Sequence, residues 1–333
     1  MLELNDTHNI SLKNSRFIDL FAGIGGFRYA MESYGAECVF SSEWDKFAQE
    51  CYENNFGEKP SGDITIIDEK EIPKHDFICA GFPCQAFSIS GHRKGFEDTR
   101  GTLFFDVARI AEFHQPKILL LENVRNFEKH DDGETLKIVL KTLDIINYRP
   151  FYKVINSSAF GVPQRRERIY IICFHKSLNI NKYYFPNGVD QISNIEMILD
   201  KNVPNEYYLD RDDIDIYKKE FINKDVFDNY PQRPLQIGKI NKGGQGERIY
   251  SPYGHAVTQA ATTGGPGGTT GLYFISNRVR SLTPKESSRV MGFPENFQPH
   301  ERKTQALKQL GNSVVVNVIQ SLVKSIVDLK VIN

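Results

Sequence analysis

The sequence predicts an α/β fold: a doubly wound, mixed but mostly parallel sheet with helices on both faces, followed by a smaller β-rich domain. Short apolar runs alternate with helical patterns from residue 16 to about residue 175, as in sheets of this kind. Glycines and carboxylates follow several of these runs, at the strand ends where such sheets bind ligands. Beyond Pro186 the sequence becomes acidic and rich in tyrosine, and beyond Pro231 it becomes rich in glycine with short β-like runs.

The first apolar run, residues 17–21, ends in a glycine-rich turn that leads into a helical pattern. It therefore predicts a strand, a turn and a helix. The same reasoning predicts further strands at residues 36–40, 117–121, 151–156 and 168–174, and one more strand that ends at Cys84. It also predicts a helix that ends near residue 57 and two helices that cover residues 102–114 and 134–147.

We expect a sheet domain over residues 1–195, a second domain over residues 196–300, and a C-terminal segment, residues 301–333, that returns to the first domain. The glycine-rich stretches 242–250 and 262–271 are expected to form loops without regular structure that approach a ligand closely. The final segment contains an amphipathic helix at about residues 314–329, with Val315, Ile319, Leu322 and Ile326 on its apolar face.

Length and composition indicate an ordinary globular chain. It has 333 residues, 40% of them hydrophobic, and no run of about 20 apolar residues that would span a bilayer. Five cysteines without a CxxC pair argue against a disulfide framework and a structural zinc site. These features predict a cytoplasmic protein that does not associate with membranes.

The net charge of −1 hides two segments of opposite sign. Residues 190–230 contain 5 Lys/Arg against 11 Asp/Glu, whereas residues 231–311 contain 11 against 4. The basic segment is a candidate nucleic-acid surface, although a solvated face without a partner is equally compatible with the charge pattern.

Cys84 is the candidate nucleophile. It follows an apolar run and lies in Gly81-Phe82-Pro83-Cys84-Gln85, where a buried strand would emerge into a loop. A thiolate in that position can add to an electron-poor carbon. The alternative is that Cys84 is a small buried apolar side chain.

A turn with Gly23 and Gly25 follows the first predicted strand and could hold a nucleotide cofactor, although it lacks a complete GxGxxG pattern. Glu43 lies about 20 residues further on and is suited to bind a ribose diol. Trp44 can stack on an adenine, and Asp63 is a plausible contact to the base. An adenosine-containing cofactor is therefore predicted.

Glu122 ends a strongly apolar strand, where loss of water would raise its pKa and make it a proton donor. A capping or ion-paired carboxylate is the alternative. Residues 164–168, Gln-Arg-Arg-Glu-Arg, precede another apolar strand. Their guanidinium groups could bind carboxylates or phosphates, or could form a surface ion-pair cluster.

Together these motifs resemble, in order, those of the DNA cytosine 5-methyltransferases over about residues 16–320. The resemblance rests on residues 17–26, 81–85, 122–124, 164–168, 245–250 and 309–315. It implies a Rossmann-like S-adenosylmethionine-dependent methyltransferase fold with a β-rich target-recognition domain at residues 196–300. It also implies transfer of a methyl group from S-adenosylmethionine to carbon 5 of cytosine, without a metal.

In the family scheme, the Cys84 thiolate adds to carbon 6 of the base while Glu122 donates to or hydrogen-bonds ring nitrogen 3. Loss of the carbon 5 proton later expels the cysteine. The resemblance implies that Arg168 holds the cytosine and helps orient Glu122. Arg166 would lie next to the phosphates, and Asn123 would support the site. Cofactor contacts carry over to Phe21, Gly23, Gly25, Glu43, Trp44, Asp63, Pro83, Leu103, Asn312 and Ser313.

The resemblance also implies base flipping, because the nucleophile must reach the face of a base. Residues 85–101 resemble the lid that closes over it. Gln245 would fill the vacated position, and Arg248 would read a guanine in the major groove. The expected DNA contacts are Gln85, Ser88, Ser90, Arg165, Gln245, Arg248, Tyr250 and Thr258. Residues 259–270 depart from the family pattern, so the expected target is a short GC-containing duplex site, of which GCGC is one possibility.

The expected biological role is that of a monomeric modification enzyme of a bacterial restriction-modification system, without an obligate protein partner. One alternative is a tRNA cytosine 5-methyltransferase with the same chemistry, which the basic, glycine-rich loops disfavour. Another is a non-catalytic DNA-binding regulator, which the intact Cys84, Glu122 and Arg168 disfavour. A redox or hydrolase function for Cys84 is weaker, because no histidine base is evident near it.

Overall fold

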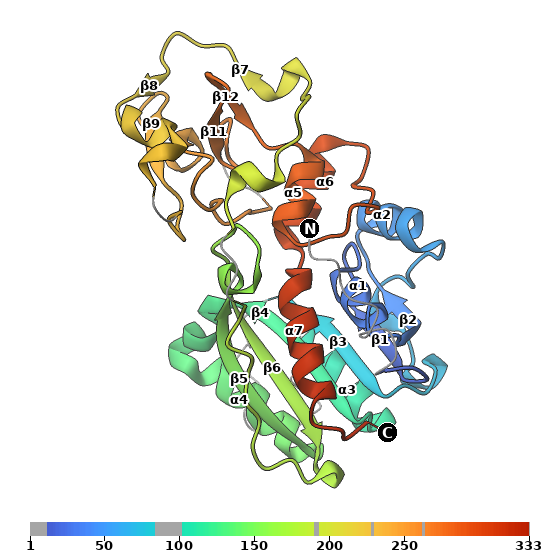
Figure 1. Cartoon of the computed structure of the whole chain (residues 1–333). Coiled ribbons are helices and arrows are strands. Elements are labelled where there is room, and N and C mark those ends of the chain that lie inside the picture. Colours follow the sequence, from blue (N-terminus) through green and yellow to red (C-terminus); the bar gives the residue numbers. More distant parts are fainter. Residues whose placement is uncertain (1–11, 84–101, 190–192, 228–229, 262–263, 333) are drawn as a thin grey trace.

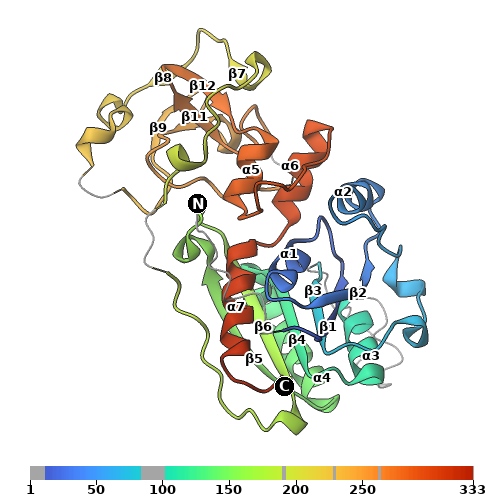
Figure 2. The ribbon, with the colours of Figure 1, turned by 45° about the vertical axis from the view of Figure 1, so that its right-hand side comes forward.

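The computed structural model describes residues 12–83, 102–189, 193–227, 230–261 and 264–332. In these residues the strands form two sheets of six. The first sheet and its helices make up the lower part of Figure 1, and the second sheet lies beyond the ends of its strands. A view turned by 45° shows the same division (Figure 2).

The first sheet has the order β2-β1-β3-β4-β6-β5. Strand β1 pairs in parallel with β2 and β3, and β3 pairs in parallel with β4. Strand β6 is antiparallel to both β4 and β5, so the prediction of a mixed, mostly parallel sheet is confirmed. The strands are β1 (Arg16–Leu20), β2 (Glu37–Ser42), β3 (Phe77–Gly81), β4 (Ile118–Val124), β5 (Tyr148–Asn156) and β6 (Glu167–His175).

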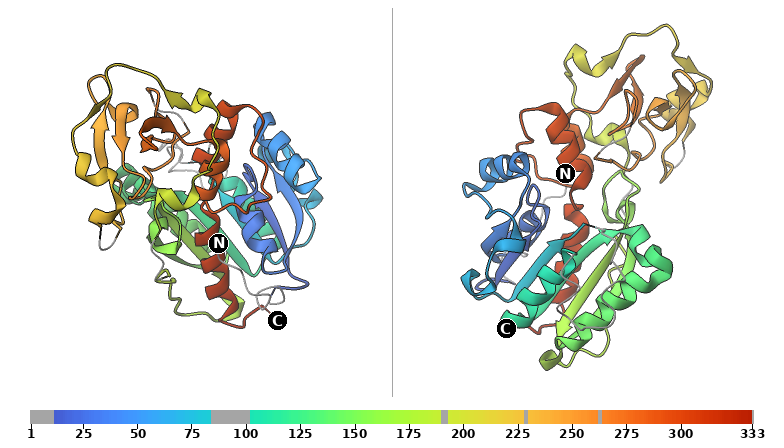
Figure 3. Two further views of the ribbon diagram at one scale, coloured as in Figure 1. Left: turned by 45° about the horizontal axis from the view of Figure 1, so that its top comes forward. Right: turned by 180° about the vertical axis from the view of Figure 1, so that it is seen from behind.

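Helices cover both faces of this sheet. α1 (Gly26–Glu32) and α7 (Val316–Val327) pack on one face, and α3 (Phe104–His114) and α4 (Glu134–Ile145) pack on the other. The view from behind shows α4 across the sheet from α7 (Figure 3). Alternate residues of the central strands serve the two cores, as Phe17 and Ile18 do in β1, because successive side chains of a strand point to opposite faces.

Strand β3 ends at Gly81 and not at Cys84 as predicted. Proline cannot donate to a ladder of hydrogen bonds, and Pro83 follows closely. Cys84 itself lies outside the described residues.

Helix α2 (Lys46–Phe56) begins directly after the candidate cofactor residues. Its N-cap, Asp45, accepts hydrogen bonds from the backbone N–H groups of Phe47 and Ala48. Gly57 ends the helix in the left-handed conformation, with φ of 75°, as C-terminal glycines commonly do. This capping fixes the position of Trp44, immediately before Asp45.

The second sheet has the order β7-β12-β11-β10-β9-β8. The expectation that residues 242–250 lack regular structure is wrong at its end, because Arg248–Tyr250 form a central strand between two neighbours. Ile249 is buried there and supplies the apolar anchor. The strands are β7 (Tyr208–Leu209), β8 (Asp215–Ile216), β9 (Gln236–Lys239), β10 (Arg248–Tyr250), β11 (Leu272–Ile275) and β12 (Arg278–Ser281).

Helix α5 (Pro284–Val290) precedes the C-terminal segment, which contains α6 (Lys303–Asn312) and α7. Helix α7 buries the predicted apolar face against the first sheet and α1. By length and composition alone, the stretch Lys303–Val327 could cross a membrane. However, 56% of its most apolar window is buried inside the protein, and the extended backbone of Ser313 separates α6 from α7. These properties fit core helices.

Candidate active site

A cavity of about 770 Å³ lies at the carboxyl ends of β1, β2, β3 and β4. It extends from the glycine turn after β1 to the segment between α6 and α7. Thirteen of the predicted catalytic and cofactor residues line it: Phe21, Gly23, Glu43, Trp44, Asp63, Pro83, Leu103, Glu122, Asn123, Arg166, Arg168, Asn312 and Ser313.

Glu43 is held rigidly at one end of the cavity. Its Oε2 accepts a hydrogen bond of 2.8 Å from the backbone N–H of Gly23, and its Oε1 accepts one of 2.8 Å from the backbone N–H of Asp45. Burial raises the pKa of Glu43, and the two backbone hydrogen bonds oppose that shift. A carboxylate so fixed keeps acceptor capacity for ligand hydroxyl groups.

Trp44 projects into solvent beside Glu43, with 80% of its surface exposed. An exposed indole at a cavity wall offers a flat apolar face to a ring. Asp63 caps a short 3-10 helix through Thr65 and also borders the cavity.

The turn after β1 is strained and tightly packed. Phe21 has a φ of 55°, a conformation that bulky residues rarely adopt outside functional sites. A Cβ atom on Gly26 would lie 2.7 Å from Cγ2 of Val314. The N-terminal turn therefore packs directly on the segment that follows α6.

Gly25 is a predicted cofactor contact, but it does not line the cavity. It caps α1 with a φ of 82°, and a Cβ atom there would clash with the ring of Phe56. Its lack of a side chain serves the packing of α1 against α2.

Glu122 and Arg168 form an ion pair at the other end of the cavity. Arg168 Nε lies 3.2 Å from Glu122 Oε1, and both side chains are largely buried. Adjacent strands bring them together, because Glu122 lies on β4 and Arg168 on β6. Burial raises the pKa of Glu122, while the positive charges of Arg168 and Arg166 oppose the rise. Glu122 is thus a carboxyl group that holds its proton more tightly than usual.

Asn123 supports the turn that leads to Cys84. Its Nδ2 donates a 2.9 Å hydrogen bond to the carbonyl of Phe82, and its Oδ1 accepts one from the N–H of Val124. Asn123 therefore fixes the backbone two residues before the candidate nucleophile. Cys84 and the predicted DNA contacts Gln85, Ser88 and Ser90 lie outside the described residues.

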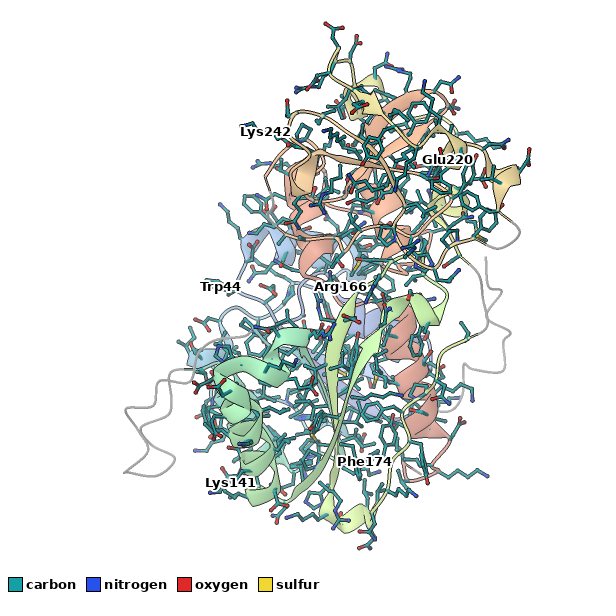
Figure 4. All side chains as sticks on the ribbon, turned by 90° about the vertical axis from the view of Figure 1, so that its left-hand side faces the viewer. Trp44, Lys141, Arg166, Phe174, Glu220 and Lys242 are labelled. Carbon is teal, nitrogen blue, oxygen red and sulfur yellow. The ribbon has the colours of Figure 1, made fainter. Side chains whose placement is uncertain are left out.

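Arg166 differs from its predicted position beside the phosphates. Only 2% of its surface is exposed, and its guanidinium group donates to the backbone carbonyls of Gln259, Gly311 and Ser313, each at 2.8 Å. Burial and the neighbouring Arg168 lower the pKa of Arg166 to about 9, so it remains a cation at neutral pH. Figure 4 shows it where the strands of the first sheet meet the upper part of the molecule.

The predicted DNA-reading residues separate into two groups. Arg165, Gln245, Arg248 and Thr258 are exposed. Tyr250 is buried in β10 and packs near Tyr273, so the prediction that it contacts DNA conflicts with its position. Regular alternation would place Arg248 and Tyr250 on the same face of the strand. A register shift between Ile249 and Tyr250 in the pairing with β9 interrupts that alternation.

The sequence reasoning missed several residues that line the cavity, including Lys308 and Gly311. Lys308 lies in α6 and forms an ion pair of 3.1 Å with Asp45, which caps α2. Gly311 lies inside one of the motifs that carry the resemblance, but nothing in the sequence shows what packs against it.

Comparison with known proteins identifies the family. Residues 15–328 match the family model described as C-5 cytosine-specific DNA methylase. The chain is 49% identical to the type II methyltransferase M.HhaI of Haemophilus parahaemolyticus, over 98% of this chain and 97% of that protein. It is 46% identical to the type II methyltransferase M.HpaII of Haemophilus parainfluenzae, over 94% and 89%.

Solved structures agree on the fold. The Dnmt2 methyltransferase of S. pombe matches with a TM-score of 0.72 at 21% identity, over 95% of this chain and 99% of that one. The cavity, the buried Glu122–Arg168 pair and the matching relatives lead to one conclusion. The chain belongs to the C-5 cytosine-specific DNA methylase family and is a DNA (cytosine-5-)-methyltransferase.

Proposed function

We propose that the chain transfers the methyl group of S-adenosylmethionine to a cytosine flipped out of a short GC-containing DNA duplex. The observation that carries this proposal is the single cavity wall that joins Glu43 and Trp44 at one end to Glu122 and Arg168 at the other. A nucleoside cofactor and a base bound at these two ends would meet near Pro83, one residue before Cys84.

The residues present fit S-adenosylmethionine. The fixed carboxylate of Glu43 suits a ribose diol, and the exposed indole of Trp44 suits an adenine. Asp63, Leu103, Asn312 and Ser313 complete the binding wall. When bound, the cofactor supplies an electrophilic methyl group.

The protein's part is to make carbon 5 of cytosine nucleophilic. The Cys84 thiolate adds to carbon 6, while Glu122 shares its tightly held proton with ring nitrogen 3. Arg168 orients the Glu122 carboxyl through their ion pair and holds the base. Asn123 fixes the approach of the chain to Cys84 through the carbonyl of Phe82.

Each part of the chain has its own role in this proposal. Residues 1–195 form the catalytic and cofactor domain, residues 196–300 recognise the target, and residues 301–333 return to the first domain. Among the described residues, the predicted DNA contacts Gln245, Arg248, Thr258 and Arg165 are exposed and available to meet DNA. Likeness to type II methyltransferases supports a role as the modification enzyme of a bacterial restriction-modification system. We propose that the enzyme acts in the cytoplasm as a monomer.

Bisulfite sequencing of DNA from cells that express this chain tests the proposal. We expect protected cytosines at one position of one short, GC-containing sequence, and none in cells that express Cys84→Ser. Methylation absent from DNA but present in tRNA would instead support the RNA-directed alternative.

A further inference from the structure

One buried cation joins the cofactor wall to the recognition domain. The guanidinium group of Arg166 donates through Nη1 to the carbonyl of Gln259 and through Nη2 to those of Gly311 and Ser313. Gly311 and Ser313 line the cofactor cavity. Gln259 belongs to the segment that carries the exposed Thr258. A single side chain therefore contacts both sides of the site.

The segment 256–261 is attached to residues 163–165, which directly precede Arg166 and strand β6. The N–H of Ala256 donates to the carbonyl of Pro163, and Thr258 Oγ1 donates to that of Arg165, both at 2.6 Å. The N–H of Gln259 donates to Gln164 Oε1 at 2.9 Å. The recognition segment therefore cannot shift without moving the residues next to Arg166.

Gly311 makes a second contact between the same two parts. A Cβ atom on this glycine would clash with the carbonyl carbon of Ala260 and would lie 2.5 Å from the backbone nitrogen of Ala261. The backbone of the cofactor wall thus packs directly on the backbone of the recognition segment. Two packed backbones leave little freedom for either to adjust independently.

The contacts of Arg166 and Gly311 with residues 259–261 form a junction between the cofactor wall and the recognition segment. The buried charge of Arg166 makes this junction sensitive to displacement. A buried guanidinium group requires hydrogen-bond acceptors in place of water, and the described contacts supply three carbonyls to Arg166. A displacement of either segment would weaken charge-assisted hydrogen bonds to the other.

We propose that Arg166, with Gly311, is a positioning device that couples cofactor binding to DNA binding. Cofactor bound against Asn312 and Ser313 fixes the carbonyls on that side to which Arg166 donates. Arg166 in turn fixes the carbonyl of Gln259, and with it the neighbouring Thr258 and the surface that meets DNA. The inference rests on the proposed function. Coupling of this kind is reciprocal, so each ligand tightens the binding of the other by the same factor.

The test is a thermodynamic binding cycle that involves no turnover. Isothermal titration calorimetry measures the affinity of the full chain for the target duplex with and without S-adenosylhomocysteine, and for S-adenosylhomocysteine with and without the duplex. In the wild type we expect a coupling factor of roughly 5 to 150, equal in both directions. Thermal melting of each variant reports whether it is folded.

Two variants address the junction, each with a matched control. Arg166→Lys keeps the charge but replaces the planar fork by one ammonium group, which cannot bind all three carbonyls as Arg166 does. Its control is Arg149→Lys, because Arg149 also donates to a backbone carbonyl, that of Ile180, but does not line the cavity. Gly311→Ala pushes the recognition segment away. Its control is Gly57→Ala, which strains the backbone at a φ of 75° but whose Cβ atom meets nothing within 4 Å and does not line the cavity.

We expect the coupling factor to fall to within about twofold of unity in both junction variants and to keep its wild-type value in both controls. Wild-type coupling in folded Gly311→Ala or Arg166→Lys would overturn the inference. A wild-type protein that binds both ligands independently would overturn it too, while leaving the proposed function intact. A wild-type protein that binds neither S-adenosylhomocysteine nor duplex would refute the proposed function itself.

Discussion

Arg168 Nε lies 3.2 Å from Oε1 of Glu122, at the place where strands β4 and β6 run side by side. The pair is not a simple salt bridge, because burial opposes the ionised form of the carboxyl group while the guanidinium group favours it. The balance leaves the pKa of Glu122 above its usual value of 4.5. The same two groups therefore set both the orientation and the protonation of the proposed acid.

Removal of Arg168 should raise the pKa of Glu122 further. The cation stabilises the carboxylate, so Arg168→Met leaves only the effect of burial and of the more distant Arg166. Titration followed by ¹³C NMR of labelled glutamate should show a midpoint above the usual range in the wild type and a higher one in the variant. Glu122→Gln identifies the signal. A midpoint that falls in Arg168→Met would contradict this account of the pair.

Cys84→Ser should abolish methyl transfer while leaving S-adenosylhomocysteine affinity near that of the wild type. The hydroxyl group of serine is a far weaker nucleophile than a thiolate, and the described residues Glu43 and Trp44 supply the proposed cofactor contacts. Radiolabelled methyl transfer to plasmid DNA and calorimetry measure the two quantities. Parallel loss of binding and activity would count against a purely chemical role.

Trp44→Ala should weaken cofactor binding by roughly 1 to 3 kcal/mol, the usual contribution of a base stacked on an aromatic ring. The free energy of unfolding of the Trp44→Ala protein should hardly differ from that of the wild type, because 80% of the side chain is exposed. Calorimetry and thermal melting separate the two effects. Ile66→Ala is the control, since Ile66 is 83% exposed but does not line the cavity, and equal losses of affinity in both variants would argue against stacking.

Gly25→Ala should destabilise the fold by roughly 2 to 4 kcal/mol, because alanine is strained at a φ of 82° and its Cβ atom would clash with Phe56. Gly62→Ala should stay within about 0.5 kcal/mol of the wild type, since a Cβ atom at Gly62 meets nothing within 4 Å. Denaturant unfolding measures both values. A Gly25→Ala protein as stable as the Gly62→Ala protein would show that α1 and α2 can readily separate.

Local patterns predicted most of the first domain. Apolar runs such as residues 117–121 specify buried strands because both faces are covered, and the turn after β1 is specified by its glycines. The carboxylates Glu43 and Glu122 each follow or end an apolar run in the sequence, and they lie at the two ends of the cavity. Their location at one edge of the sheet follows from the parallel topology alone.

The remaining features depend on contacts between distant segments. Arg166 looks like a surface cation in the sequence, and only the approach of Gln259 and Gly311 buries it. Strand β10 forms despite its glycine-rich flank because β9 and β11 pair with it on both sides. The contact between Gly25 and Phe56 likewise requires the packing of two helices, which no local pattern encodes.

The most direct test of the central claim, that Cys84 adds covalently to a flipped cytosine, uses duplex DNA with 5-fluorocytosine at the target position. Fluorine cannot leave carbon 5 as a proton does, so a methylated adduct should persist. With S-adenosylmethionine present, peptide mass spectrometry should locate a DNA adduct on Cys84, and Cys84→Ser should give none. Methylation of ordinary target DNA without any such adduct, or an adduct on another residue, would contradict the account.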